Sequence, residues 1–306
     1  MFFMIKWLVN ILISIFFIQC LHSQSKTIHS FPDSIINSRL YLVGGAGTSI
    51  YVGGLSYLSF VWYKDHERVP FHFYNDSQGY LQMDKFGHAY AAYWESYAAY
   101  NALRWAGVDK KRALLWAGPV GFVFQAPIEV FDGLYEGWGF SWWDIAANTF
   151  GSALFTAQQA IFDEQIVHMK FSYSPSGHPK YHHILGENEF QSFFLDYNGH
   201  THWLSSSIHR ITGIDFVPKW LNFAVGYSAN GMIFEFENPT WYRGELFPEL
   251  ERYRQYFFSL DIDLTKIPAK RKWVRTTLKV LNTVKIPFPA LEINRVNGLI
   301  FRPLYF

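Results

Sequence analysis

Three consecutive segments of this chain place acidic or amide side chains on the same helical face as small residues, and this pattern constrains the fold most strongly. Between Asp84 and Ala106, the side chains of Asp84, His88 and Glu95 lie within about 40° of one another at about 100° per residue. Alanines share that face, and tyrosines occupy the opposite one. Because burying a charge is unfavourable unless it is paired, we expect the polar faces of the three segments to meet.

The two following segments repeat this pattern. One helix is expected over residues 110–131, with Pro119 and Pro127 bending or interrupting it, and another over residues 141–162. The predicted polar cluster on the three helices comprises Asp84, Lys85, His88, Glu95, Gln125, Glu129, Asp132, Asp144 and Asn148. Within it, Lys85 is placed to neutralise one of the carboxylates.

Four members of this cluster have the spacing and the chemistry of a catalytic or metal site. Asp84 and His88 are four residues apart and Glu129 and Asp132 are three apart, so each pair shares one face of its helix. These groups can move a proton or hold a divalent metal ion, the only cofactor that the sequence suggests. The same residues also suit simpler roles. Asp84 can cap its helix, and a capping box accounts for Asp144. Buried polar pairs can also be purely structural, or they can bind a lipid head group.

The N-terminus has the form of a secretory signal. Residues 1–23 contain one charged residue followed by an apolar run that is too short to span a bilayer. Cleavage is expected at Ser23 or Gln24. The alternative is a lipoprotein signal ending at Cys20, but bulky residues precede this cysteine where small ones are normally required. We therefore expect an exported protein of the cell envelope.

A polar lead-in at 24–38 precedes an uncharged run from Leu40 to Tyr63. Its 24 residues are enough to cross a hydrocarbon core. The glycines that favour close helix packing in lipid are Gly44, Gly45, Gly47, Gly53 and Gly54. We expect this run to span or enter a membrane, and a buried helix or hairpin of a soluble domain is the alternative.

Residues 166–306 have a different character. Short alternating runs at 221–236, 255–264, 286–293 and 299–306 are typical of strands. A basic amphipathic helix is expected over 270–284, with Lys270, Arg271, Arg275 and Lys279 mostly away from its apolar side. In an exported protein this favours a membrane surface with anionic lipid head groups, and the solvated face of an ordinary helix is the alternative.

Composition and motifs exclude several functions. With 26 basic and 25 acidic residues, the chain has no electrostatic excess that would attract a nucleic acid. The sequence contains no serine elbow, no phosphate-binding glycine loop and no HExxH motif. A histidine-rich stretch is expected to form a loop with its histidines on the surface: His178, His182, His183, His200, His202 and His209.

Three motifs occur in an order that resembles a known family. Asp84-Lys85-x-x-His88, Glu129-x-x-Asp132 and Asp144-x-x-Ala147-Asn148-x-x-Gly151 resemble the YfiM-like family of predicted periplasmic lipoproteins. The same order is more distantly similar to VanZ-like membrane proteins, whose second motif has glutamine where this chain has Asp132. The resemblance covers about residues 40–165. It implies an envelope location and a helical unit with a polar cluster, and it implies no particular reaction.

These observations predict a mainly α protein. A four-helix membrane-associated unit over 39–165, with VanZ-like motif order, would precede a mixed α+β region with short strands over 166–306. The expected function is a non-catalytic accessory component of the cell envelope, at the outer membrane, that binds lipid head groups or a membrane-protein complex. The expected partners are therefore membrane lipid and an outer-membrane protein complex, and no nucleic acid.

The alternative function is a metal-dependent or acid/base-dependent enzyme that acts on a lipid or a lipid-linked glycan. Its acid/base or metal-binding residues would be Asp84, His88, Glu129 and Asp132.

Overall fold

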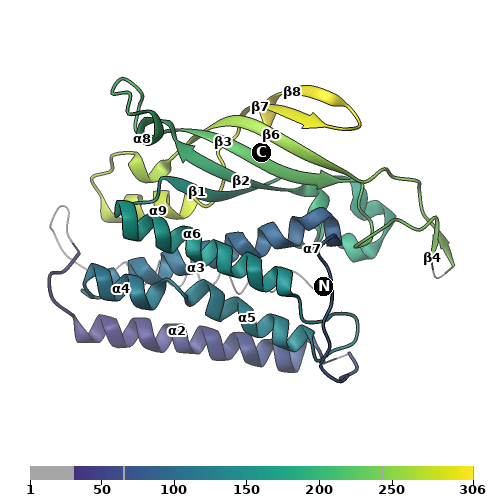
Figure 1. Ribbon diagram of the computed structural model, residues 1–306, viewed down its shortest axis with the longest axis horizontal. Coiled ribbons are helices and arrows are strands. Elements are labelled where there is room, and N and C mark those ends of the chain that lie inside the picture. The colour runs from purple at the N-terminus through teal and green to yellow at the C-terminus, as the bar shows by residue number, and fades with distance from the viewer. Residues whose placement is uncertain (1–30, 65, 243, 306) are drawn as a thin grey trace. The chain divides into compact units, whose positions relative to one another are not determined.

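The structure is a computed structural model that describes residues 31–64, 66–242 and 244–305. The predicted signal peptide at 1–23, including Cys20, lies outside the described residues. The prediction of a mainly α protein with a four-helix unit is wrong, because a six-stranded antiparallel sheet accompanies the helices in a mixed α/β fold (Figure 1). Alternation of polar and apolar residues can indicate a single strand, but it does not show how many other strands will pair with it. The sequence pattern therefore did not indicate the extent of the sheet.

The chain forms two compact units that are interleaved in sequence. The helical unit contains the described residues up to Asp76 together with His88–Gln165. The sheet unit contains Ser77–Gly87 together with Ile166–Phe306. Helix α3 (Met83–Trp105) begins in the sheet unit and continues in the helical unit from His88 onward.

Five α-helices and one π-helical turn are described in the helical unit. Their bounds are α2 Asn37–Tyr57, η2 Leu58–Trp62, α3 Met83–Trp105, α4 Lys110–Ala117, α5 Val120–Asp132 and α6 Trp142–Phe162. Side-chain caps define two of the starts: Asp109 accepts a hydrogen bond from the backbone N–H of Arg112, and Ser141 accepts one from that of Asp144. The helix predicted over 110–131 is divided between α4 and α5, because Pro119 cannot continue a helix that begins before it.

Glycines bring α3, α5 and α6 close together. A Cβ atom on Gly121 of α5 would lie 2.0 Å from the carbonyl oxygen of Ala92, and one on Gly151 of α6 would lie 2.1 Å from that of Ala89. The glycines of α2 do not take part in this approach, because a Cβ at Gly44 or at Gly47 would meet no atom of the described chain within 4 Å. The small residues that let helices approach are therefore on α5 and α6.

One described helical stretch is long and apolar enough to cross a membrane, and it differs from the predicted one. It extends over Lys110–Asp132, by length and composition alone. This stretch includes the break between α4 and α5, and core helices of soluble proteins also meet the same criterion. It therefore gives little support to a membrane-spanning segment.

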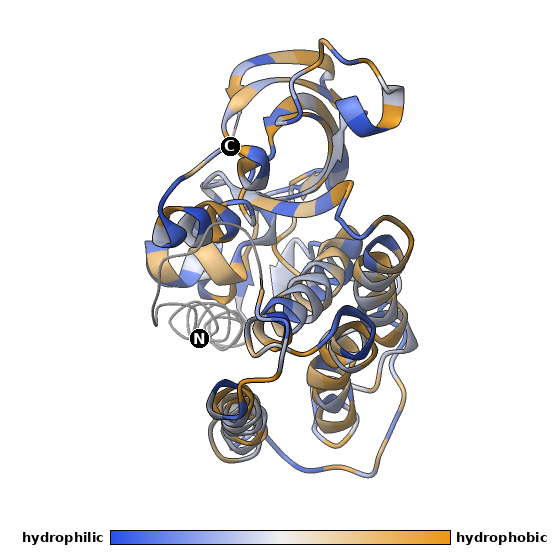
Figure 2. Cartoon of the chain, turned by 90° about the vertical axis from the view of Figure 1, so that its left-hand side faces the viewer, coloured by the Kyte–Doolittle hydropathy of each residue, from blue (hydrophilic) through white to orange (hydrophobic). Residues whose placement is uncertain are grey.

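The sheet unit is built on antiparallel strands in the order β1-β2-β3-β6-β7-β8. Their bounds are β1 Val167–Tyr173, β2 His200–Ser207, β3 Leu221–Asn230, β6 Tyr253–Ile262, β7 Phe288–Asn294 and β8 Gly298–Tyr305, and a separate ribbon pairs β4 Trp241–Tyr242 with β5 Glu245–Leu246. The four predicted strand regions are confirmed as β3, β6, β7 and β8. Figure 2 shows that the six-stranded sheet is strongly curved.

Short helices complete the sheet unit. Their bounds are η3 Gly79–Gln82, η4 His178–Tyr181, η5 His183–Leu185, α7 Glu189–Leu195, η6 Tyr197–Gly199, α8 Ile208–Thr212, η7 Leu264–Lys266 and α9 Lys272–Leu281. The concave side of the sheet has a small aromatic core, where Tyr305 stacks on Phe257 at 4.2 Å between ring centroids and Phe257 packs beside Trp203.

The inserted segment 77–87 contains a strained turn, which is held in place by contacts with the rest of the sheet unit. Tyr80, Leu81 and Gln82 have φ angles of 44°, 50° and 68°, in the left-handed region that is unfavourable for residues with a side chain. The backbone N–H of Tyr80 donates to the carbonyl oxygen of Glu235 at 2.7 Å, and Arg254 donates to the Gln82 side chain at 2.8 Å. Contacts with the C-terminal part of the chain thus hold a turn that is unfavourable on its own.

Candidate functional site

His88 lies at the centre of a buried polar group in the helical unit. Its Nε2 atom is 3.8 Å from Oε1 of Glu129 on α5 and 3.7 Å from Oδ1 of Asp144 on α6. Its Nδ1 atom is 3.2 Å from Oδ1 of Asn148, also on α6. We call these four residues the His88 cluster, and all of them are buried. Three helices therefore bring an imidazole and two carboxylates together, as the sequence predicted.

Backbone hydrogen bonds accepted by two serines fix the helices around this cluster. Ser96 of α3 donates to the carbonyl oxygen of Gly118 at 2.8 Å and accepts from the N–H of Gly121 at 3.1 Å. Ser152 of α6 accepts from the N–H of Phe122 at 2.8 Å. These bonds satisfy the first N–H groups of α5, which have no partner within their own helix. Sequence analysis did not identify Ser96, because this residue lies between the predicted small-residue face and the tyrosine face.

Glu95 and Gln125 form a second pair in the helical unit. Gln125 Nε2 donates to Glu95 Oε1 at 2.7 Å, and the other carboxylate oxygen, Oε2, has no hydrogen-bond partner among the described residues. Burial raises the pKa of Glu95 well above its ordinary value, and the hydrogen bond from Gln125 opposes this only in part. Burial thus disfavours the charged form of Glu95, in contrast to a carboxylate that is paired with a cation.

Asp132 accepts a short hydrogen bond from the buried hydroxyl of Tyr63. The Tyr63 ring stacks on Tyr135 at 4.4 Å and meets Trp138 edge-on at 5.4 Å. Burial first, and then the negative charge of Asp132, raise the pKa of the Tyr63 hydroxyl. Tyr63 is a site residue that sequence analysis missed, because it was counted only as the end of the uncharged run.

Asp84 and Lys85 belong to the sheet unit. Asp84 Oδ1 accepts a hydrogen bond from the Tyr197 hydroxyl at 2.8 Å, and its Oδ2 lies 3.3 Å from Lys85 Nζ. The prediction that Lys85 neutralises a carboxylate is confirmed for Asp84. The nine residues of the predicted cluster thus divide between the two units, with seven in the helical unit and two in the sheet unit.

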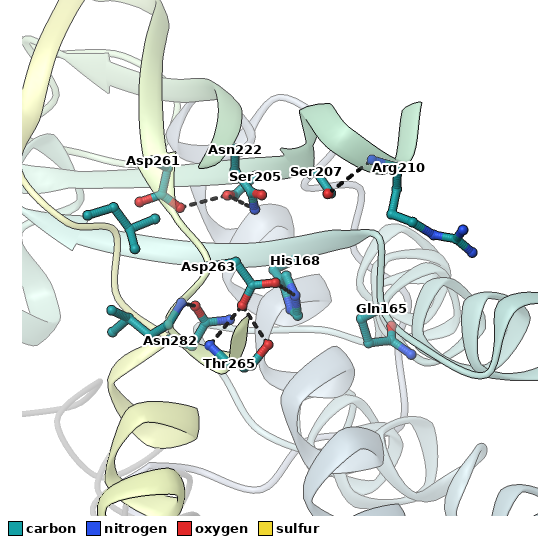
Figure 3. Close-up of polar contacts among 12 residues, drawn as sticks. Gln165, His168, Ser205, Ser207, Arg210, Asn222, Asp261, Asp263, Thr265 and Asn282 are labelled. Atoms are coloured by element: carbon teal, nitrogen blue, oxygen red, sulfur yellow. Dashed lines mark hydrogen bonds and ion pairs between the residues drawn. The ribbon is translucent and has the colours of Figure 1, made fainter. Parts of the chain in front are cut away.

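A second buried polar group lies on the inner face of the sheet. Lys170 Nζ is 2.7 Å from Asp261 Oδ2, and neither side chain is exposed. Ser205 donates to the same carboxylate at 2.6 Å, and Asn222 donates to Ser205 at 2.9 Å (Figure 3). Sequence analysis missed this group, because its members come from four strands, β1, β2, β3 and β6, that are separated in the sequence.

His168 and Asp263 form a further buried pair beside this group. Their side chains are 3.3 Å apart, and the Thr265 hydroxyl donates to Asp263 at 2.6 Å (Figure 3). Burial alone would raise the pKa of Asp263, but the hydrogen bonds and charge contributed by His168 and Thr265 outweigh burial and lower it to about 2. Asp263 is therefore ionised at neutral pH.

Two histidines of the histidine-rich stretch are buried, so their predicted surface position is wrong. Burial lowers the pKa of His200 to about 4, and burial together with the neighbouring His200 lowers that of His202 to about 3. The ring of His202 faces Phe86 at 6.1 Å and Phe171 at 5.5 Å. The stretch was interpreted as a loop, whereas β2 carries both residues into the interior.

The predicted basic helix is confirmed as α9, and its charges are unevenly exposed. Lys270 and Arg271 are exposed, as is the neighbouring Lys272, which the prediction did not include. Arg275 and Lys279 are only half-exposed. The cationic surface is thus concentrated at the N-terminal end of the helix.

Taken together, the fold and these buried groups define a two-unit α/β protein with separate polar interiors. Residues 72–159 match a family described as "Predicted periplasmic lipoprotein (DUF2279)". This match confirms the predicted resemblance to YfiM-like periplasmic lipoproteins and shows no link to VanZ-like proteins. The protein is exported and associated with the cell envelope, in agreement with this family. No curated protein and no solved structure matches the chain.

Proposed function

We propose that the protein is a non-catalytic accessory component of the cell envelope, at the outer membrane, that binds anionic lipid head groups through the N-terminal end of α9. Its export and its resemblance to periplasmic lipoproteins support the location. In this proposal, the buried polar groups of the helical unit hold α3, α5 and α6 in place, and lipid is bound elsewhere.

The observation that carries the proposal is a run of three exposed cations at an uncapped helix start. Lys270, Arg271 and Lys272 are consecutive and exposed, and the N-cap residue of α9, Arg271, makes no side-chain capping hydrogen bond among the described residues. Positive charges in this position oppose the helix dipole, at a cost of about 0.3–1 kcal/mol each. A phosphate bound there would reverse this effect, since helix N-termini favour anions. Trp273, which is 52% exposed, supplies the type of ring that lies at head-group level in membranes.

A similar basic run on α4 provides a comparison. Lys110, Lys111 and Arg112 also begin a helix, but Asp109 caps this helix and lies 3.4 Å from Arg112. Lys110 forms an ion pair with Asp163. Acidic neighbours thus partly neutralise the α4 run. The sequence around α9 differs in composition, because residues 266–285 contain seven basic residues and no acidic one.

Vesicle flotation of the full chain tests this proposal. With phosphatidylglycerol-containing vesicles, replacing Lys270, Arg271 and Lys272 by alanine should weaken binding by about 100-fold, since each basic residue near an anionic surface contributes about 1 kcal/mol. The matched control replaces Lys110, Lys111 and Arg112 and should keep most of the binding. An equal loss in both variants would show that net charge alone determines binding and would contradict a specific role for α9.

A second candidate function rests on the His88 cluster. One imidazole and two carboxylates from three helices form a ligand set that suits a divalent cation or acid/base chemistry on a lipid or lipid-linked glycan. Metal analysis of the purified protein, together with His88→Ala and Glu129→Ala, tests this function. Folded variants that retain function in vivo, from a protein that contains no metal, would rule it out.

A further inference from the structure

The convex face of the six-stranded sheet presents a continuous row of apolar side chains. The row follows the strand register from Leu204 through Val225, Phe258 and Leu291 to Phe301, one residue from each of β2, β3, β6, β7 and β8. The exposed fractions are 38% for Leu204, 40% for Val225, 38% for Phe258, 44% for Leu291 and 61% for Phe301. We call these five residues the apolar row.

The register positions on both sides of the apolar row also hold exposed, mostly apolar side chains. Tyr256, Ile293 and Leu299 occupy consecutive register positions on one side of the apolar row, and Phe223 pairs with Leu260 on the other. All five side chains are exposed. From β3 to β8, none of these register positions holds a charged residue, so the face is apolar across four adjacent strands.

The opposite face of the same strands is buried, and polar side chains surround its small aromatic core. Besides the Lys170–Asp261 pair, Glu292 accepts hydrogen bonds from Gln255 at 2.6 Å and from Arg302 at 2.9 Å. A sheet with one face in water normally has apolar residues inside and polar residues outside. Here the alternation is reversed, and this reversed pattern is the one that strands facing lipid adopt. Hydrophobic (orange) and hydrophilic (blue) residues alternate along parts of the strands in Figure 2.

We propose that the apolar row and its neighbours contact the acyl chains of one leaflet of a bilayer. This inference deepens the proposed function and rests on it, because it adds a hydrocarbon contact to the head-group contact of α9. β3 and β6 have 10 residues each, but β7 and β8 have only 7 and 8 where a membrane-spanning strand needs about 9–11, so the apolar face as a whole is too short to cross a bilayer. The sheet therefore lies on the membrane and does not cross it.

The chemistry of the face favours lipid over a protein partner. Protein interfaces carry roughly one hydrogen bond per 100–200 Å² and a polar rim. Among the ten exposed side chains named above, the Tyr256 hydroxyl is the only group able to hydrogen-bond. In the same register positions, the hydroxyl of Tyr227 on β3 is already bonded to the Leu81 carbonyl oxygen, and Ser206 lies on β2. Such a face has almost no hydrogen-bonding groups that would fix the orientation of a protein partner. Acyl chains bind through apolar contact alone and need no such groups.

A charge substitution tests the contact in vesicles of phosphatidylcholine alone, which carry no net charge. The full chain should float with these vesicles, and Leu291→Lys should weaken binding at least about tenfold, equivalent to about 1.4 kcal/mol. The matched control is Leu246→Lys, because Leu246 is 82% exposed but belongs to the separate β4–β5 ribbon. Equal binding by the wild type and Leu291→Lys would overturn the proposal.

A second measurement does not depend on a charge at that position. A nitroxide attached to a cysteine that replaces Leu291 should become accessible to lipid-dissolved oxygen, and inaccessible to a water-soluble nickel chelate, when vesicles are added. A label at Asn297, in the exposed turn between β7 and β8, should stay accessible to the chelate. A label at position 291 that remains in contact with the chelate would contradict lipid contact even if the lysine variant misfolds.

The same experiments separate the two proposals and other occupants of the face. If the α9 alanine variant binds phosphatidylglycerol vesicles normally while Leu291→Lys loses phosphatidylcholine binding, the head-group proposal fails and the acyl-chain contact stands. The reverse result overturns the acyl-chain contact alone. A wild type that is dimeric by light scattering, becomes monomeric in Leu291→Lys and does not float with vesicles would assign the face to a second copy of the chain and overturn the proposal.

Discussion

The pKa of a buried carboxyl group in this protein depends on the side chains next to it. Glu95 has only the Gln125 amide beside one oxygen, so burial favours its protonated form. Asp263 has His168 and Thr265 as donors and stays ionised, with a pKa of about 2. The pKa values of two carboxyl groups that are similarly acidic in water are thus shifted in opposite directions, according to the donors around them.

The raised pKa of Glu95 leads to a first prediction. Glu95→Gln should change the free energy of unfolding at pH 7 by less than about 0.5 kcal/mol, since an amide replaces a protonated carboxyl of the same shape. Glu95→Ala should cost about 2 kcal/mol, because it leaves the Gln125 amide unpaired and creates a cavity. Chemical denaturation of the two variants measures both. A large loss in Glu95→Gln would mean that this carboxyl is ionised.

A second prediction concerns His200 and His202. Their native pKa values, about 4 and about 3, lie below the unfolded value of about 6.5, so the unfolded chain takes up protons first as the pH falls. Stability is therefore fully present above about pH 6.5 and is lost progressively toward pH 4. At pH 5 the loss amounts to about 2 kcal/mol for each histidine.

Replacing His202 separates this contribution. In His202→Phe, the difference in unfolding free energy between pH 7.5 and pH 5 should shrink by about 2 kcal/mol, as measured by urea denaturation at the two pH values. His183→Phe, at an exposed position, is the matched control. An unchanged pH dependence in His202→Phe would show that this histidine is already charged in the native state.

At the scale of elements, helix approach is decided by a few glycines. Gly121→Ala would place a Cβ atom 2.0 Å from the Ala92 carbonyl oxygen, so α3 and α5 would have to separate. We expect a loss of about 3 kcal/mol in unfolding free energy, at the upper end of overpacking costs. Gly44→Ala on α2 is the control, because it meets no atom within 4 Å and should stabilise the helix by about 0.5–1 kcal/mol. Thermal unfolding of both variants tests this contrast, and a destabilised Gly44→Ala would contradict the open surroundings of α2.

Much of the helical unit was predictable at this scale, and much of the sheet was not. The spacing of Glu129 and Asp144 relative to small residues predicted which faces of α5 and α6 meet His88, because helical periodicity places side chains without knowledge of distant partners. In β2, both faces contain polar or aromatic residues, so no alternation identified it as a strand. The burial of His200 and His202 depends on other parts of the sheet unit, and sequence pattern alone does not reveal such contacts.

At the scale of the whole molecule, the segment Ser77–Gly87 connects two units that are not continuous in sequence. Met83 packs with Tyr197, Ala229 and Met232, which all come from the C-terminal half of the chain. The family match at residues 72–159 therefore includes residues from both units. This matched segment is not a complete folding unit.

A truncated chain tests this interleaving. A chain ending at Gln165 lacks every partner of segment 77–87 in the sheet unit, so Met83 and its apolar neighbours would be exposed. We expect it to bind the dye ANS and to be cleaved by protease within residues 77–87, whereas the full chain is protected there. The assay is limited proteolysis with mass spectrometry, and equal protection in both chains would contradict a dependence on the C-terminal residues.

The strained turn at Tyr80–Gln82 has a consequence for biogenesis. A secreted polypeptide crosses the inner membrane from its N-terminus, so this turn reaches the periplasm well before Glu235 and Arg254, the residues that hold it. During that interval the segment has no stable conformation of its own, and its apolar side chains are available to other proteins. We therefore expect the newly translocated chain to depend on a periplasmic chaperone until its last strands have emerged.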